Sequence, residues 1–522
     1  MEPKDTTQNL SILPFLANGP DGDQNIYQSI GVEPIINCRG TFTIIGGSVE
    51  LPEVLAAMEA ASGYFVQYDE LAQGVGQRLA EITGAEWGMI ASGCAAGMKH
   101  VTIACVTGGN PEKLIRIPDL AGLDRTQVIV PGYSRTAYDH ALRNVGVELV
   151  TVETPEELEA AINPRTAMIY IVTGGGSIPG QPLSLEVIAE IARPRDIPIL
   201  ADAAAENLTI PCVHLEQGAT VVTYSGGKAL CGPQSAGLVL GRKDILMSAW
   251  QASSPHHGPG RDDKVGKEEI MGLLAAVEAW VTRDHAAEWK GWLGLLANIS
   301  KRVETIDGVT TSVEERTGLS NRSPTLTISW DPAALHITGE EVAEDFARKT
   351  PRIAVGSGDE EGVSACIRIT PSQMQPGDDA VVAARVHGIL SADRSPRSTA
   401  LKPAAVDLSG RWDLTVDYSS SSSQQRLSIS QDGNWIEGIH ESEFSVLELI
   451  GVVEGDQVKL RSEMRQPGNA ITFLFSGTAS GDRMSGSIHL GEYLTAKFTA
   501  ERSSHRAPRR PISIPGGAPL AT

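Results

Sequence analysis

The stretch "VVTYSGGKALCGPQSAG", residues 221–237, carries the clearest fold signal in the sequence. An apolar run typical of a buried strand leads into a glycine-rich turn, and a second apolar run follows the turn. Lys228 stands alone in that turn, three residues after Ser225. Burying an amino group is costly unless the protein uses it, because desolvation disfavours its charged form. The stretch therefore predicts a strand that ends at a chemically active lysine.

The sequence around this stretch, residues 31–285, alternates short apolar segments with amphipathic ones. We expect strands at "WGMIAS", "TQVIV", "VELVTV", "TAMIYIV", "IPILAD" and "TVVTYS", and a long helix over residues 266–284. This alternation predicts an α/β domain whose mostly parallel sheet is covered by helices on both faces. Residues 286–393 mix helix and strand, which predicts a smaller α+β domain.

A polar, proline-containing linker at residues 394–405 precedes a change in the period of the sequence. From Trp412 to Tyr418, apolar and polar side chains alternate, and turn sequences such as "QDGN" and "EGDQ" follow. This pattern predicts an all-β domain over residues 406–503. It would be an antiparallel sandwich or a barrel that resembles the lipocalins, with Trp412 and Trp435 in its core.

The composition limits the partners of the protein. The 522 residues include 43 Lys and Arg against 64 Asp and Glu, and the formal net charge of −21 disfavours binding to nucleic acid or to an anionic membrane. The six cysteines are scattered without metal-type spacing, as in reduced cytoplasmic proteins. No signal peptide is recognisable, and no apolar run reaches the ~20 residues of a membrane span. We therefore expect a cytoplasmic protein with an unstructured arm at residues 1–30 and an unstructured tail at residues 504–522.

Lys228 is a candidate for covalent attachment of a cofactor. A buried lysine can form a Schiff base with an aldehyde, and pyridoxal phosphate is the cofactor that most often uses such a lysine. This cofactor also needs a carboxylate beside its pyridine nitrogen, and Asp202 ends the segment "IPILAD" about 26 residues before Lys228. Taken alone, Asp202 could equally cap a helix, and Lys228 could be an ordinary loop lysine.

A phosphate site is expected at the turn after the segment "WGMIAS". Ser92, Gly93, Cys94 and Ala95 are small, so their backbone N–H groups can approach an anion at the start of the following helix. Ser225 offers a hydroxyl for the same phosphate. A glycine-containing turn is more often plain chain geometry, but the order of turn, carboxylate and lysine along the chain favours a cofactor site.

Four separated segments resemble one known family: "DELAQGVGQRLAEITGAEWGMIASGCAAG", "AYDHALRNVGVELVTV", "ILADAAAEN" and "YSGGKALCGPQSAGLVLGRKDIL". Over about residues 30–390 the chain is similar to the fold-type-I pyridoxal phosphate enzymes, in the branch of selenocysteine synthase (L-seryl-tRNA selenium transferase) and D-glucosaminate-6-phosphate ammonia-lyase. The resemblance implies a homo-oligomer, a dimer or larger, with shared active sites and with Lys228 as the cofactor-binding lysine. The short acidic N-terminus differs from that of the tRNA-binding members, so the chain looks more like the ammonia-lyase side. Where many relatives carry a histidine that stacks on the cofactor ring, this chain has Ser134, which leaves the reaction type open.

Substrate-binding residues are expected among the basic side chains. Fold-type-I enzymes commonly hold the substrate carboxylate with an arginine of the small domain, and Arg368 matches that place, with a solvated strand-edge arginine as the alternative. Arg39 and Arg135 lie in segments that resemble the family's site. Arg261 and Lys264 belong to the loop "HHGPGRDDKVGKEE", which either binds an anionic substrate from a neighbouring subunit or is a solvated charge run. The adjacent histidines of that loop point apart, so we expect no metal there.

These features predict a pyridoxal-phosphate enzyme that removes the Cα proton of a small amino acid, with Lys228 and Asp202 as catalytic residues. The favoured reaction is β-elimination from a 2-amino-3-hydroxy acid, which releases ammonia. A racemase, an epimerase or an aminotransferase would share the first step, so the motifs do not separate them. The lipocalin-like domain keeps another class open, a ligand-binding or scaffolding protein with an inactive cofactor fold.

Overall fold

The computed structural model describes residues 26–360, 364–396 and 400–504. Parts of three segments that were expected to be irregular lie outside these described residues. Most of the expected N-terminal arm (residues 1–25), three residues of the expected linker (397–399) and nearly all of the expected tail (505–522) lie outside the described residues.

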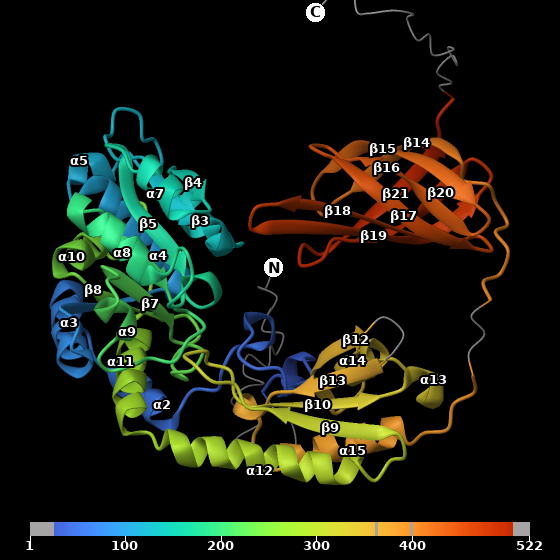
Figure 1. Cartoon of the computed structure of the whole chain (residues 1–522), viewed down its shortest axis with the longest axis horizontal. Coiled ribbons are helices and arrows are strands. Elements are labelled where there is room, and N and C mark those ends of the chain that lie inside the picture. Colours follow the sequence, from blue (N-terminus) through green and yellow to red (C-terminus); the bar gives the residue numbers. More distant parts are fainter. Residues whose placement is uncertain (1–25, 361–363, 397–399, 505–522) are drawn as a thin grey trace, which may run out of the picture. The chain divides into compact units, whose positions relative to one another are not determined.

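The chain divides into two compact units, Met1–Pro396 and Arg397–Thr522. The first unit holds a large and a small domain, and the second holds a β-barrel (Figure 1). Each of these three parts has its own cluster or clusters of buried apolar side chains. No helix in the described part of the chain is long and apolar enough to cross a membrane.

A seven-stranded sheet forms the centre of the large domain, in the order β2-β8-β7-β6-β5-β3-β4. Neighbouring strands run parallel except at β8, which is antiparallel to both β2 and β7. β8 follows β7 directly through the turn that carries Lys228, and strands joined without a crossover run antiparallel. The prediction of a mostly parallel sheet is confirmed. The strands are β2 (Trp87–Ala91), β3 (Gln127–Pro131), β4 (Glu148–Val152), β5 (Thr166–Val172), β6 (Ile199–Asp202), β7 (Val221–Ser225) and β8 (Gly237–Gly241).

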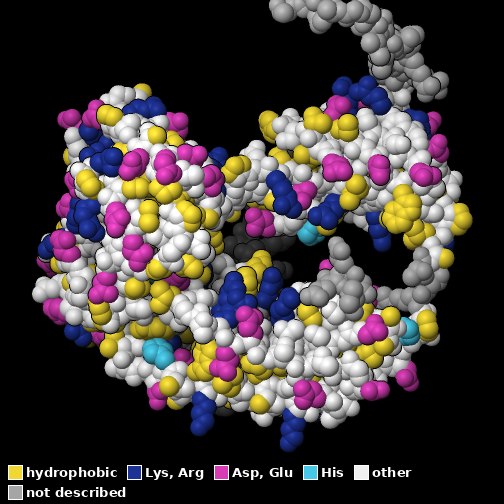
Figure 2. All heavy atoms as spheres, in the orientation of Figure 1, with side chains coloured by type: hydrophobic (Ala, Val, Ile, Leu, Met, Phe, Trp, Pro, Cys, Tyr) yellow, Lys and Arg dark blue, Asp and Glu magenta, His cyan; other side chains and the backbone are white. Residues whose placement is uncertain are grey.

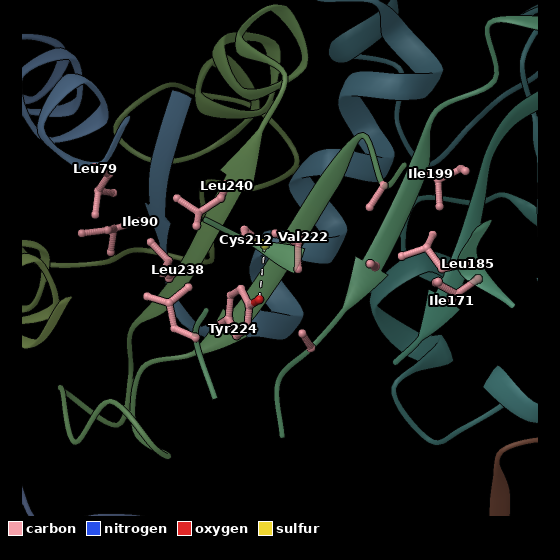
Figure 3. Packing of buried hydrophobic residues seen from close by; sticks show 14 of the residues in the cluster. Leu79, Ile90, Ile171, Leu185, Ile199, Cys212, Val222, Tyr224, Leu238 and Leu240 are labelled. Atoms are coloured by element: carbon pink, nitrogen blue, oxygen red, sulfur yellow. Dashed lines mark hydrogen bonds between the residues drawn. The ribbon is translucent and has the colours of Figure 1, made fainter. Parts of the chain in front are cut away.

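Helices cover both faces of this sheet. In strand β3, Val128 and Val130 pack into one apolar cluster while Ile129 packs into the other. Successive side chains of a strand point to opposite faces, so a strand buried on both faces is apolar throughout. Figure 3 shows part of one cluster, where the Tyr224 hydroxyl lies 3.4 Å from the Cys212 sulfur. The main helices are α2 (Pro52–Ser62), α3 (Tyr68–Thr83), α4 (Gly93–Thr107), α7 (Pro155–Ala161), α8 (Leu185–Ala192), α10 (Lys243–Ala252) and α11 (Lys267–Thr282).

The small domain packs three helices with an antiparallel sheet in the order β12-β13-β10-β9. An N-terminal strand, β1 (Ile35–Asn37), pairs in parallel with β11 (Arg352–Ala354), and the adjacent Cys38 is fully buried in the small-domain core. The pattern of residues 31–285 predicts this segment in the large domain, and a three-residue strand is too short for its sequence to indicate a different partner. The other elements are α12 (His285–Val303), β9 (Val309–Glu314), β10 (Thr325–Trp330), α14 (Gly339–Arg348), β12 (Gly356–Glu360), β13 (Ser364–Ile369) and α15 (Asp378–Leu390).

Eight antiparallel strands close into a barrel in the second unit. Each strand pairs with its neighbours in sequence, and β14 also pairs with β21, so the predicted barrel is confirmed. Trp412 is fully buried in the core as expected, but Trp435 is 65% exposed, because the adjacent Ile436 takes the inward position of β16. The strands are β14 (Gly410–Asp417), β15 (Ser422–Asp432), β16 (Trp435–Glu441), β17 (Val446–Glu454), β18 (Gln457–Gln466), β19 (Asn469–Ser480), β20 (Arg483–His489) and β21 (Thr495–Arg502).

His440 is buried in the barrel with both ring nitrogens partnered. Nδ1 lies 2.7 Å from Ser462 Oγ and Nε2 lies 2.7 Å from Gln425 Oε1, and burial lowers the pKa of His440 to about 4. An unfolded histidine has a pKa of about 6.5, so between these two values the unfolded chain binds the extra proton. We expect the barrel to lose about 3 kcal/mol of stability as the pH falls from about 6.5 to about 4.

Hydrogen exchange of the barrel amides in the full chain, corrected for the intrinsic exchange rate, measures this loss. His440→Gln should flatten the pH dependence, because glutamine takes up no proton in this range. His489→Gln, at an exposed histidine of the same barrel, should leave the dependence unchanged. If His440→Gln and the wild type lost the same stability on acidification, groups other than His440 would cause the loss.

Candidate active site

The turn after β7 places Lys228 at the carboxyl end of that strand. Its backbone is held on both sides, because Gly226 N donates to Ala236 O at 2.9 Å and Arg283 donates to Ala229 O at 3.1 Å. A side chain at Gly226 would meet Ala236 O at 2.6 Å, so this close approach requires glycine. Lys228 lines a cavity of about 450 Å³ between the large and the small domain. The lysine is therefore fixed in the wall of a cavity that a small molecule can enter.

Asp202 ends strand β6 and is almost fully buried. Three groups donate to its carboxylate: Ala204 N at 3.1 Å, the Tyr170 hydroxyl at 3.1 Å and Cys94 Sγ at 3.4 Å. Burial raises the pKa of Asp202, while the positive charge of Lys228 acts to lower it. A desolvated carboxylate of this kind is stabilised by a cation, such as the protonated ring nitrogen of pyridoxal phosphate.

The expected phosphate turn lies at the same edge of the sheet. Gly237 pairs with Ala91 at the end of β2 and with Ser225 at the end of β7, so Ser225 and the start of α4 flank Gly237. Gly93 has a φ of +84°, and a side chain at Gly237 would lie 2.4 Å from the Gly93 carbonyl carbon. Because Gly237 has no side chain, the turn at Gly93 can pack directly against β8. This places the first backbone N–H groups of α4 at this edge of the sheet.

The variant Gly237→Ala tests this packing. The added methyl group displaces the turn at Gly93, and we expect the dissociation constant for pyridoxal phosphate to rise about tenfold, as for the loss of one charge-assisted hydrogen bond. Gly74→Ala on α3 is the matched control, because a side chain there meets nothing within 4 Å. Absorbance titration of the ligand-free protein with pyridoxal phosphate measures both variants. Equal affinity of Gly237→Ala and Gly74→Ala for pyridoxal phosphate would show that binding does not depend on the close approach of Gly93 to Gly237.

The Lys228 cavity has a basic lining. Arg39 and Arg368, both predicted from the sequence, line it together with Lys228, and none of its described lining residues is acidic. Arg368 on β13 donates to Ser357 O at 3.4 Å, and Arg39 lies over the ring of Phe42. The site therefore combines an amine with positive charge suited to an anionic substrate.

Sequence reasoning missed three residues of this cavity, Arg316, Asn321 and Arg322, in the loop between β9 and β10. Their segment "RTGLSNRS" is polar and has no period, which is typical of a solvated loop. The only signal was the pair of arginines. Nothing in the sequence connects this loop with the turn at Lys228, because the contact depends on how the two domains meet.

Of the predicted residues, Asp202, Ser225 and the Ser92–Ala95 turn are outside the cavity lining, and so are four further candidates in the single chain. The Ser134 side chain is fully buried, and its hydroxyl accepts a backbone hydrogen bond from β5 at 2.9 Å. Arg135 is paired with Asp139 at 2.6 Å. Arg261 donates to a serine of its own loop at 3.4 Å, and Lys264 belongs to the same loop. Contacts of Arg261 and Lys264 with a substrate at Lys228 would need a second subunit.

The fold and its matches to known proteins define a class of protein, the pyridoxal-phosphate enzymes of fold type I. The family model "Aminotransferase class-V" matches residues 140–265. The D-glucosaminate-6-phosphate ammonia lyase of Salmonella typhimurium (strain 14028s / SGSC 2262) is 31% identical over 299 residues, which are 56% of this chain and 78% of that protein. The chain belongs to the fold-type-I pyridoxal phosphate family of that ammonia lyase, as its sequence motifs predicted.

Other comparisons agree with this assignment. The 5'-C-glycyluridine monooxygenase-decarboxylase of Streptomyces sp is 29% identical over 338 residues, 63% of this chain and 83% of that protein. The L-seryl-tRNA(Sec) selenium transferase of Moorella thermoacetica is 26% identical over 334 residues, 56% of this chain and 66% of that protein. A solved structure of D-glucosaminate-6-phosphate ammonia-lyase matches with a TM-score of 0.63 and 26% identity, over 70% of this chain and 98% of that one. These relatives are named as enzymes, and the comparisons imply pyridoxal phosphate as the cofactor.

Proposed function

We propose that this chain binds pyridoxal phosphate through Lys228 and catalyses β-elimination from a small 2-amino-3-hydroxy acid, as an ammonia-lyase. The observation that carries the proposal is the position of Lys228 in a cavity that Arg368 also lines, with the buried Asp202 within electrostatic reach. The 31% sequence identity with the Salmonella ammonia lyase, whose name includes a phosphorylated amino sugar acid, supports elimination over the other reactions.

The residues present fit the cofactor. Lys228 would hold the aldehyde carbon, Asp202 the ring nitrogen, and the turn Ser92–Ala95 with Ser225 the phosphate. Asp202 accepts three hydrogen bonds but has no cation within 4 Å among the described residues. A buried carboxylate without a cation is costly, so the ring nitrogen would supply the positive charge that this site lacks.

The reaction follows from what these side chains can do. Bound pyridoxal phosphate supplies a sink for the electrons left on Cα. Lys228 would hold the cofactor until the substrate binds, and its free amine would then accept the Cα proton, while Asp202 would keep the ring nitrogen protonated. Lys228 then passes its proton to the departing 3-hydroxyl group, which leaves as water. Hydrolysis of the unsaturated amino acid that remains consumes one water and releases ammonia. One 2-amino-3-hydroxy acid therefore gives one 2-keto-3-deoxy acid and one ammonia.

Arg368 orients the substrate in this scheme. Its guanidinium donates to the Ser357 carbonyl at 3.4 Å and has no carboxylate within 4 Å among the described residues, so N–H donors remain for the substrate carboxylate. Holding the carboxylate in the small domain and the amine at Lys228 fixes the Cα–H bond next to the base.

The experiment that tests this function is a reaction panel with the purified holoenzyme. It is incubated with 2-amino-3-hydroxy acids, including amino sugar acids with and without a phosphate. We expect ammonia and a 2-keto acid in equal amounts and no oxygen uptake. A keto acid without free ammonia would indicate amino transfer, and loss of optical activity alone would indicate a racemase. Oxygen uptake would point to the reaction class named for the Streptomyces relative, and each of these three results would overturn the proposal.

We also propose a homo-oligomer, a dimer or larger, in which a neighbouring subunit brings Arg261 and Lys264 to the Lys228 cavity. The fully exposed Phe65, between α2 and α3, supports this, since exposed aromatic side chains are enriched at protein interfaces. Light scattering should give a multiple of the chain mass, and Phe65→Asp should shift it to smaller species. Phe444→Asp, at an exposed phenylalanine of the barrel, is the control. A monomeric wild type would contradict the proposal.

A further inference from the structure

A second cavity adjoins the Lys228 cavity and shares part of its wall. Its volume is about 260 Å³, and the residues that line both cavities are Thr41, Lys228, Asn321, Arg322 and Ser372. The first cavity is basic, and Figure 2 shows Lys and Arg side chains gathered where the large and small domains meet. Arg368 lines the first cavity and not the second. An amino acid with its Cα at Lys228 and its carboxylate at Arg368 can therefore direct its side chain into the second cavity.

Tryptophans line this second cavity but not the first, namely Trp280, Trp289 and Trp292, and we refer to it as the tryptophan cavity. The Trp280 indole N–H donates to Leu208 O at 2.9 Å, and the Trp289 indole N–H donates to Glu315 Oε2 at 2.8 Å. Trp289 and Trp292 lie on one face of α12 and meet edge to face, with their ring centroids 5.9 Å apart. The indoles are therefore held in place, and their partly exposed carbon surface lies beside the lysine.

The charged side chains that line only the tryptophan cavity are partnered with one another. Glu288 lies 3.9 Å from Arg283 and 3.8 Å from His285. Arg283 also donates to Ala229 O at 3.1 Å and to Leu230 O at 3.2 Å. These charges offset one another, so the contacts that remain for a ligand come chiefly from the indole rings. Such a lining favours an uncharged substrate side chain over an anionic one.

A serine side chain would leave most of the tryptophan cavity empty. A cavity of about 150 Å³ already accommodates a benzene molecule, whereas the tryptophan cavity has about 260 Å³. Aromatic rings pack edge to face or offset against tryptophan, and such pairs gain more than the burial of equal area alone. The cavity therefore fits a single aromatic ring better than it fits a hydroxymethyl group or an aliphatic chain.

We propose that the substrate is a 2-amino-3-hydroxy acid with an aryl group on Cβ, and that the tryptophan cavity selects it by packing against the aryl ring. The carboxylate lies at Arg368, the amine and Cα lie at Lys228, and the ring lies among the three indoles. Elimination then gives one 3-aryl-2-keto acid and one ammonia. The assignment rests on the proposed function for the reaction and adds the chemical class of the substrate.

Binding of amino acids that lack the 3-hydroxyl group tests the tryptophan cavity without elimination. Calorimetry on the holoenzyme uses both enantiomers of each acid. Phenylalanine should bind about 10–100-fold more tightly than alanine, the factor that corresponds to burying an aromatic side chain. Leucine should bind more weakly than phenylalanine. Equal affinity for phenylalanine and alanine would overturn the proposal, as would tighter binding of leucine than of phenylalanine.

Variants of Trp292 assign the preference to the indole rings. Trp292→Ala is expected to weaken phenylalanine binding about 3–10-fold and to leave alanine binding unchanged, because alanine has no ring to reach the cavity. Trp292→Phe keeps an aromatic ring on α12 and should recover most of the loss. Trp435→Ala, at the exposed tryptophan of the barrel, is the control and should change neither affinity. An equal loss for both acids in Trp292→Ala and Trp292→Phe would show a structural role and would overturn the proposal.

Kinetics with 3-phenylserine and serine separate this proposal from the proposed function. We expect a lower KM for 3-phenylserine, and Trp292→Ala should raise that KM about 3–10-fold without changing the KM for serine. Arg368→Gln should raise both, since both acids carry the carboxylate. A higher kcat/KM for serine or for an amino sugar acid than for 3-phenylserine would overturn the selection of an aryl group. If no acid releases ammonia, the proposed function fails, and the binding of phenylalanine still decides the role of the tryptophan cavity.

Discussion

Lys228→Ala is expected to remove both the visible absorption of the bound cofactor and the release of ammonia, with a fall in rate of at least about 10²–10⁴-fold. In the proposed mechanism the same amine attaches the cofactor and moves the Cα proton, so its loss would remove two functions at once. No other lysine is among the described residues that line the cavity. Absorption spectra and an ammonia assay on the purified variant measure the two effects.

Two further variants identify the cause of that loss. Lys228→Arg keeps the positive charge but offers no nucleophilic amine at neutral pH, so it should be as inactive as the alanine variant. Lys290→Ala, at an exposed lysine of α12, should behave as the wild type. Activity in Lys228→Arg close to that of the wild type would reduce the role of this side chain to electrostatics.

Asp202→Asn is expected to lower the rate about 10²–10³-fold, the range found when one electrostatic stabiliser is removed from an active site. The neutral amide cannot hold the ring nitrogen of the cofactor in its protonated form, so charge on Cα is less stabilised. The variant keeps the shape of the side chain, and Lys228 still attaches the cofactor. Activity and cofactor absorption, measured on the same sample, separate the two effects.

Tyr170→Phe is the matched comparison for the aspartate. It removes one of three donors to the carboxylate, the hydroxyl 3.1 Å from Asp202 Oδ2, and leaves the carboxylate in place. We expect a much smaller loss of rate, because Ala204 N and Cys94 Sγ still donate. If Asp202→Asn cost no more than Tyr170→Phe, the carboxylate would not act on the cofactor ring.

The α/β core was predictable because its signals are local. Each buried strand of the large domain is an apolar run, and a strand must end where its run ends. The turn at Lys228 and the carboxylate at Asp202 each follow such a run, so the sequence places both at the same edge of a parallel sheet. The alternating pattern from Trp412 onwards predicted the barrel by the same local rule.

The features that were not predictable depend on contacts between distant segments. Arg316 and Asn321 line the cavity only because the small domain meets the large one. The three-residue strand β1 gains its place from the pairing with β11, and no pattern of three residues encodes a partner. Trp435 was expected in the barrel core because tryptophan side chains are mostly buried. The register of β16 instead points Ile436 into the barrel and Trp435 outward.

Reduction of the holoenzyme with borohydride, followed by mass analysis of its peptides, tests the central claim most directly. The reagent makes the bond between lysine and cofactor permanent, so the modified residue is identified and not inferred from activity. We expect a single modified peptide, with the cofactor on Lys228, and no modified peptide from Lys228→Ala. Modification of another lysine, or none in a protein saturated with pyridoxal phosphate, would contradict the assignment of Lys228 as the cofactor-binding residue.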